Sequence, residues 1–175
     1  MSSTWKLVNL GDRKYRLETA SSRLIGWIQG HAIGLSGLRD AGEALEWAPA
    51  LRRALDDALV RQYPDRYRPV EDLADLRLVH DGAYEWIAAG DVPIGRLHRP
   101  SSNRPAGCLT VEFVLPSYAS EEVTIACAEI LATMLYDGIL ARSLDCEGGE
   151  APSRRVATGR GRHGWTPVVS ARAFN

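Results

Sequence analysis

Apolar and polar positions alternate in short segments along most of the chain, the pattern of half-buried strands. In the first half this alternation predicts four strands, at residues 4–10, 14–19, 23–29 and 32–38. In the second half it predicts four more, at residues 75–80, 83–89, 92–98 and 108–115. Glycine-containing turns separate successive strands, which favours antiparallel hairpins. The last segment is the most apolar of the eight, so we expect it to lie in the centre of the sheet.

Two longer segments follow a helical rhythm, with apolar residues at i, i+3 and i+4. The first begins after Asp40, an N-cap residue with Glu43 three positions on, and ends before Pro64. We expect Pro49 either to kink this helix or to start a second one. The second is predicted over residues 120–140 and begins with acidic residues that suit a helix N-terminus. Its buried face is predicted to consist of Val123, Ala126, Cys127, Ile130, Leu131, Met134 and Leu135.

These elements predict an α+β fold, with a mainly antiparallel sheet and two principal helices packed on one face. Each half of the chain runs through strands and then a helix. A Trp-Ile pair, a turn glycine and an Ile-Gly pair follow one another from both Trp27 and Trp86. We therefore predict two pseudo-repeated units, residues 4–63 and 74–140, with a chance likeness of two hairpins as the alternative.

The 175 residues suit one domain, which we place at residues 1–144. Residues 145–175 are rich in glycine and arginine and are predicted to be flexible. Within them, residues 165–170 regain some strand character, so this part is a candidate for docking on the domain.

Charge and cysteine content exclude several classes of protein. The net charge of −1 gives no general attraction to nucleic acid or to anionic membrane. No apolar run is long enough to span a membrane, and no basic and apolar leader follows Met1. The three cysteines, Cys108, Cys127 and Cys146, are too widely spaced for a zinc site or a disulfide framework. We expect a cytoplasmic protein that does not bind membranes.

Motifs for catalysis and for cofactors are not found in the sequence. It contains neither glycine-rich nucleotide-binding pattern, and its four histidines lack metal-ligand spacing. Ser36, between Gly34 and Gly37, only partly resembles a nucleophile elbow and lies in a predicted strand. We therefore expect no cofactor and no metal, and we assign no catalytic residue.

Three sets of residues are candidates for binding. An anion site is predicted from three arginines and a histidine in and after one strand, namely Arg96, His98, Arg99 and Arg104. The alternative is a charged sheet edge that discourages aggregation. A nucleic-acid contact is predicted from Arg154, Arg155, Arg160 and Arg162, with a solvated tail as the alternative. Trp27 and Trp86 are candidates for an interaction face, provided that they are exposed.

The sequence as a whole favours a small non-catalytic binding or accessory module that acts through a protein partner or through self-association. One alternative is a nucleic-acid-binding protein that uses the arginine-rich tail and the loop at residues 96–104. The other is an enzyme or sensor for a small anionic ligand near Arg96 and His98. Convergence of these two residues with an acid from another segment in one pocket would favour that second alternative.

Overall fold

In a computed structural model, which describes residues 5–22, 24–99 and 109–148, eight strands form a single antiparallel sheet. The order across the sheet is β1-β2-β3-β4-β8-β7-β6-β5. The fourth strands of the two halves, β4 and β8, are therefore neighbours in the middle of the sheet. The strands are β1 (Trp5–Gly11), β2 (Lys14–Thr19), β3 (Leu24–Gln29), β4 (Ala32–Leu38), β5 (Leu76–Asp81), β6 (Tyr84–Ala89), β7 (Val92–His98) and β8 (Leu109–Val114). The predicted α+β class and the central place of β8 are both confirmed.

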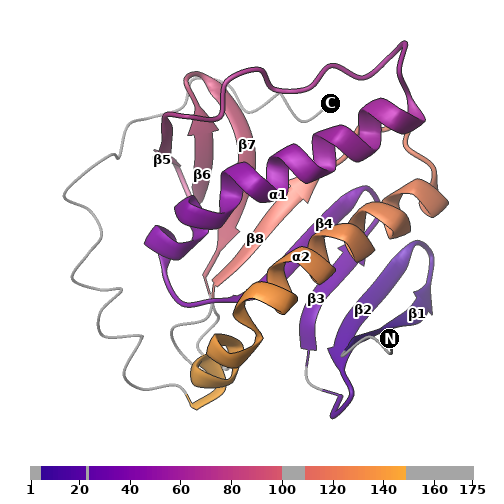
Figure 1. Cartoon of the computed structure of the whole chain (residues 1–175), viewed down its shortest axis with the longest axis vertical. Helices are drawn as coiled ribbons and strands as arrows, with labels where there is room; N and C mark the ends of the chain where they lie inside the picture. Colours follow the sequence, from indigo (N-terminus) through magenta and orange to yellow (C-terminus); the bar gives the residue numbers. More distant parts are fainter. Residues whose placement is uncertain (1–4, 23, 100–108, 149–175) are drawn as a thin grey trace.

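Helices α1 (Ala41–Gln62) and α2 (Glu121–Gly148) both cover the same face of this sheet (Figure 1). The side chain of Asp40 caps α1, because it accepts a hydrogen bond of 2.9 Å from the backbone N–H of Glu43. Pro49 lies inside the helix, which continues unbroken to Gln62. Of the two predicted alternatives, a second helix starting at Pro49 is therefore wrong, and a kink at Pro49 stays a prediction.

The buried face of α2 differs from the predicted one, since two of the predicted inner residues, Ala126 and Ile130, are exposed. The residues that turn inward are Thr124, Cys127, Ala128, Leu131, Ala132, Leu135 and Tyr136. The reason is that α2 packs against α1 as well as against the sheet. The Tyr136 hydroxyl lies within hydrogen-bonding distance of the backbone carbonyls of Ile25 and Ser36 and donates its one hydrogen to this pair, which fixes α2 over β3 and β4.

A buried polar network ties α1 to the sheet. The Arg52 guanidinium donates to the Asp56 carboxylate at 2.9 Å, to the Tyr67 hydroxyl at 3.0 Å and to the Ile94 carbonyl at 3.0 Å. The same carboxylate accepts from the Tyr67 hydroxyl and from the Val70 backbone N–H. Each buried charge thus has a partner, so the network holds β7 at Ile94 to α1 and to the connector that follows this helix.

The two halves share an element order of four strands and one helix, and they also share an irregularity. In the third strand of each half, an isoleucine before a glycine is an extra residue relative to the neighbouring strand: Ile25 in β3 and Ile94 in β7. The segments compared in the sequence do not correspond in this way, because Trp27 lies in a third strand and Trp86 in a second. Descent of the halves from a duplication stays a prediction.

Candidate functional site on the back face of the sheet

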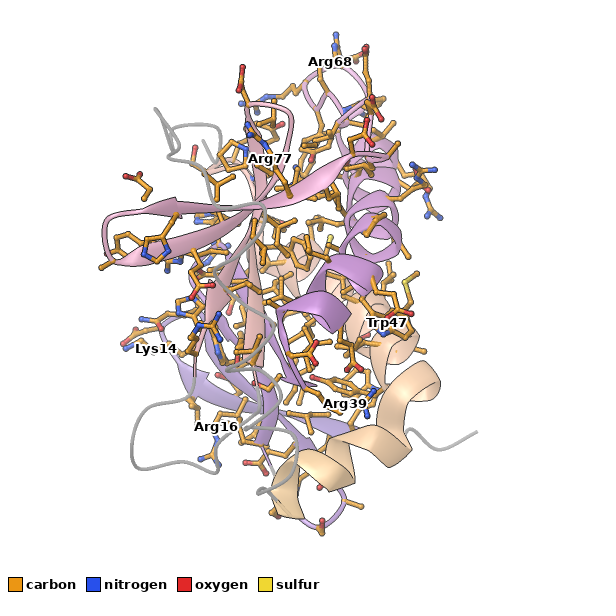
Figure 2. All side chains as sticks on the ribbon, turned by 90° about the vertical axis from the view of Figure 1, so that its left-hand side faces the viewer. Lys14, Arg16, Arg39, Trp47, Arg68 and Arg77 are labelled. Atoms are coloured by element: carbon orange, nitrogen blue, oxygen red, sulfur yellow. The ribbon has the colours of Figure 1, made fainter. Side chains whose placement is uncertain are left out.

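We call the sheet face that is turned away from α1 and α2 the back face. Figure 2 shows the side chains of Lys14 and Arg16 on this side of the sheet, away from the helices. When the residues paired between neighbouring strands are followed from β1 to β5, one residue of each strand lies on a single line across the back face. This transverse row consists of Val8, Arg16, Trp27, Gly34, Glu112, Arg96, Trp86 and Val79. From Arg16 to Trp86 it crosses five strand spacings, or about 24 Å.

Trp27 is held flat on the sheet because its neighbour in the row is a glycine. A Cβ atom at Gly34 would lie 2.2 Å from Cε2 of the Trp27 indole, so the ring occupies the space that a side chain would take. One ring face therefore packs on backbone, and the other is turned outward. The His98 ring meets the Trp27 ring edge-on, with 6.2 Å between ring centroids. Trp27 is thus half-buried and fixed in orientation without any ligand.

At the centre of the row, Glu112 connects two of the predicted site residues. Its Oε1 atom lies 2.6 Å from Nη2 of Arg96 and 3.0 Å from Nε2 of His98. The Arg96 Nε–H also points at His98 Nε2, at 3.3 Å. A neutral Nε2 atom cannot accept from Arg96 and donate to Glu112 at the same time. The two contacts of His98 therefore belong to different protonation or tautomeric states.

The charge of Glu112 makes the group of Arg96, His98 and Glu112 a weaker binding site for an anion. Burial raises the pKa of the Glu112 carboxyl, but the hydrogen bond from His98 and the charge of Arg96 outweigh burial and hold the pKa below its ordinary value. Glu112 is therefore ionised at neutral pH and compensates the charge of Arg96. An anionic ligand would have to displace a carboxylate that is only 6% exposed.

Next to Arg96, the row ends in an aromatic cluster in which Trp86 is buried and Tyr84 is exposed. The Arg96 guanidinium carbon lies 5.0 Å from the ring centroid of Tyr84 and 5.7 Å from that of Trp86. Trp86 is only 6% exposed and forms a small buried cluster with Val79 and Ala88, separate from the main core. Trp86 therefore does not meet the condition of exposure on which it was a candidate for an interaction face.

The opposite end of the row is open and positively charged. Arg16 is directly opposite Trp27, and Lys14 lies two residues along the same strand; both are exposed. The nearby acid is Glu18, which is 7% exposed and lies 3.0 Å from Arg16. Lys6, opposite Glu18 on β1, is also exposed. A ligand approaching this end would meet basic groups first, with the carboxylate beneath them.

The remaining predicted site residues are not part of this arrangement. Arg99 binds Glu85, with Nη2 of the arginine 2.9 Å from the carboxylate Oε2. Arg104 lies outside the described residues, and so do Arg154, Arg155, Arg160 and Arg162. Of the predicted anion site, the structure thus brings together only Arg96 and His98, and it places Trp27 beside them.

Sequence reasoning missed Glu112, Arg16 and Lys14. Glu112 is the one charged residue in an otherwise apolar strand segment, and an acid at such a position signals a buried partner. Lys14 and Arg16 alternate with Tyr15 and Leu17, which indicates that the two basic residues share one face of a strand. Nothing in the local sequence indicates that this face is the one that carries Trp27.

Among the described residues, no group of three or more His, Cys, Asp or Glu side chains is placed to hold a metal ion. Neither helix, over its described residues, is long and apolar enough to cross a membrane. No family model, no curated protein and no solved structure matches the chain.

Proposed function

We propose that the protein is a non-catalytic binding module that recognises a protein partner through the back face of its sheet. The observation that carries the proposal is the transverse row. It presents Trp27 as a fixed, partly exposed ring beside the exposed Arg16, and tryptophan and arginine are the residues most enriched at the energetic centres of protein interfaces.

Preorganisation supports this proposal further. Binding usually costs free energy because side chains lose rotamer freedom at the interface. Here Trp27 is already packed on Gly34 and in contact with His98, so its orientation requires no further ordering. A partner would therefore meet a surface that is largely formed before it arrives.

The convergence of Arg96, His98 and Glu112 is the arrangement that an enzyme or an anion sensor would need, so this alternative is a second candidate. The same geometry also weakens it, because Glu112 compensates the charge of Arg96. Thr110, the register partner of His98, has its hydroxyl engaged in a hydrogen bond of 2.8 Å with the Ser36 hydroxyl. We therefore place the binding module first.

The proposal can be tested by affinity capture with the full chain and two charge-reversed forms. In the first form Lys14→Glu and Arg16→Glu are combined; in the matched control, Arg53→Glu and Arg61→Glu reverse two exposed arginines of α1. The partner is identified from extracts of the native cells and purified, and its binding to each form is then measured directly.

We expect the control to bind this purified partner as the wild type does, and the back-face form to lose binding. Equal binding by both forms would overturn the proposal. So would turnover of a small anionic substrate that is abolished by His98→Gln, since this result would establish the enzyme alternative.

A further inference from the structure

The back face offers two possible contact regions, and only one of them is available. In the half formed by Glu112, Arg96, Trp86 and Val79, which we call the closed half, the ionic and aromatic groups already contact one another. In the half formed by Val8, Arg16, Trp27 and Gly34, which we call the open half, one ring face of Trp27 and the head groups of Lys14 and Arg16 remain accessible. A ligand would therefore bind at the open half.

Charge determines the kind of ligand that this region accepts. The exposed charges on and beside the open half are those of Lys6, Lys14 and Arg16, whereas the carboxylate of Glu18 is buried next to Arg16. Consecutive residues on one face of a strand are about 7 Å apart. Lys14 and Arg16 thus present two positive groups at the spacing of alternate side chains in an extended segment, and a ligand with acidic groups is complementary to them.

The aromatic groups favour a protein over a single-stranded nucleic acid. Sequence-tolerant binding of a nucleic-acid strand relies on several accessible rings on which successive bases stack. Here Trp86 is buried, and the exposed ring of Tyr84 lies four strand spacings from Trp27, or about 19 Å. A single aromatic anchor with a charged rim is instead the usual arrangement of a protein-binding hot spot.

Charge also argues against a second copy of this chain as the partner. A symmetric dimer through the back face would bring Lys14 and Arg16 of both copies together, which costs free energy through like-charge repulsion. Contact between the back face of one copy and the helices of another would join opposite sides of the molecule. Such head-to-tail contacts produce open stacks rather than a closed dimer.

We propose that the open half binds an acidic segment of a partner protein, with an apolar side chain of that segment on the outward ring face of Trp27 and its carboxylates at Lys14 and Arg16. This inference rests on the proposed function and specifies the chemistry of the partner. It also assigns Trp27, Lys14 and Arg16 as the residues that determine specificity.

Three defined probes test the inference against the full-length protein. The first is a twelve-residue peptide of Asp and Glu with a central Leu-Phe pair. The second has the same centre with Lys in place of every acid, and the third is a twelve-nucleotide oligothymidylate. Binding is followed by backbone and indole N–H chemical shifts at low and at high salt, with wild type, the Lys14→Glu/Arg16→Glu form and the Arg53→Glu/Arg61→Glu control.

We expect the acidic peptide alone to bind, to shift the Trp27 indole signal and to weaken as salt rises. Two reversed rim charges should lower its affinity by about tenfold, and the control should leave the affinity unchanged. Stronger binding of the oligonucleotide through the same residues would overturn the inference in favour of nucleic acid. Equal binding of both peptides, or of none of the three probes, would also overturn it.

The two proposals can fail separately. If the purified partner from the capture experiment needs Lys14 and Arg16 but the acidic peptide does not bind, the acidic-segment inference is wrong and the proposed function stands. If the partner binds the charge-reversed form unchanged, the proposed function itself is wrong.

Discussion

In each half of the transverse row an arginine and a tryptophan lie side by side on neighbouring strands, yet only one of the two tryptophans is accessible. The difference in accessibility follows from the central residue of each half, Glu112 in one and Gly34 in the other. Glu112 has a carboxylate that binds Arg96, which in turn packs near Trp86 and closes that half. Gly34 has no side chain, so Trp27 lies on the backbone with one ring face outward. Glu112 and Gly34 thus separate a structural cluster from the surface for which we propose a binding role.

The largest effect that this comparison predicts is on stability after truncation of each tryptophan. Trp86→Ala removes a buried ring and should lower the free energy of unfolding by about 3–5 kcal/mol. Trp27→Ala removes a ring that is already partly in water, so the loss should be about 1–2 kcal/mol. Urea unfolding of both variants measures the difference. Equal losses would show that the two halves are equally buried.

Glu112→Gln should remove the ion pair with Arg96 that holds the closed half together. Because the folded protein lowers the pKa of this carboxyl, its contribution to stability is present above the unfolded pKa and is lost as pH falls through the folded pKa. The variant should therefore be less stable than wild type by about 2 kcal/mol at pH 7. This gap should narrow as pH falls below about 4.5. A gap that does not change between pH 7 and pH 3 would contradict the assigned ion pair.

Gly34→Ala should disturb the open half without affecting the closed half. The new methyl group would overlap the Trp27 indole, so the ring must leave its place at a cost of about 1–2 kcal/mol. Gly95→Ala is the matched control, since its methyl group would lie 3.3 Å from Phe113 and needs only a small adjustment. Thermal unfolding and the indole N–H signals compare the two. An unmoved Trp27 signal in the Gly34 variant would be evidence against the flat packing.

The smallest effect is expected for Arg16→Ala. Its ion pair with Glu18 is exposed on the arginine side but buried on the carboxylate side, so the free energy of unfolding should fall by about 1 kcal/mol, less than in Glu112→Gln. Partner binding should nevertheless weaken, which separates a binding role from a structural one. If stability fell as much as in Glu112→Gln, Arg16 would be a structural residue like Arg96.

The strands and helices could be predicted from the sequence because each depends on a local pattern. Three strands, at residues 14–19, 32–38 and 92–98, have the bounds that the alternation indicates, and Asp40 caps α1 as its position implies. The predicted buried face of α2 was wrong by about one residue. Apolar content alone did not show that Ala128 and Ala132 are buried while Ile130 faces solvent.

The site was harder to predict, because it depends on register across strands that are distant in sequence. Gly34 and Glu112 are neighbours only because β4 pairs with β8, and the alignment of Arg96 with Trp86 follows the bulge at Ile94. A shift of one residue in either register would place these side chains on the helix-covered face. Individual residues such as Arg96, His98 and Trp27 could therefore be identified in advance, whereas their grouping with Glu112 and Arg16 could not.

The accessibility of the two tryptophans tests the central claim most directly. Protein labelled with 5-fluorotryptophan gives one fluorine signal for each indole, and Trp27→Phe and Trp86→Phe assign the two signals of interest. Paramagnetic agents of negative and of neutral charge then report how closely each ring is approached from solvent. We predict that the Trp27 signal broadens, more with the anionic agent than with the neutral one, while the Trp86 signal is unchanged. Equal broadening of both signals, or no preference of Trp27 for the anionic agent, would contradict the division into an open basic half and a closed half.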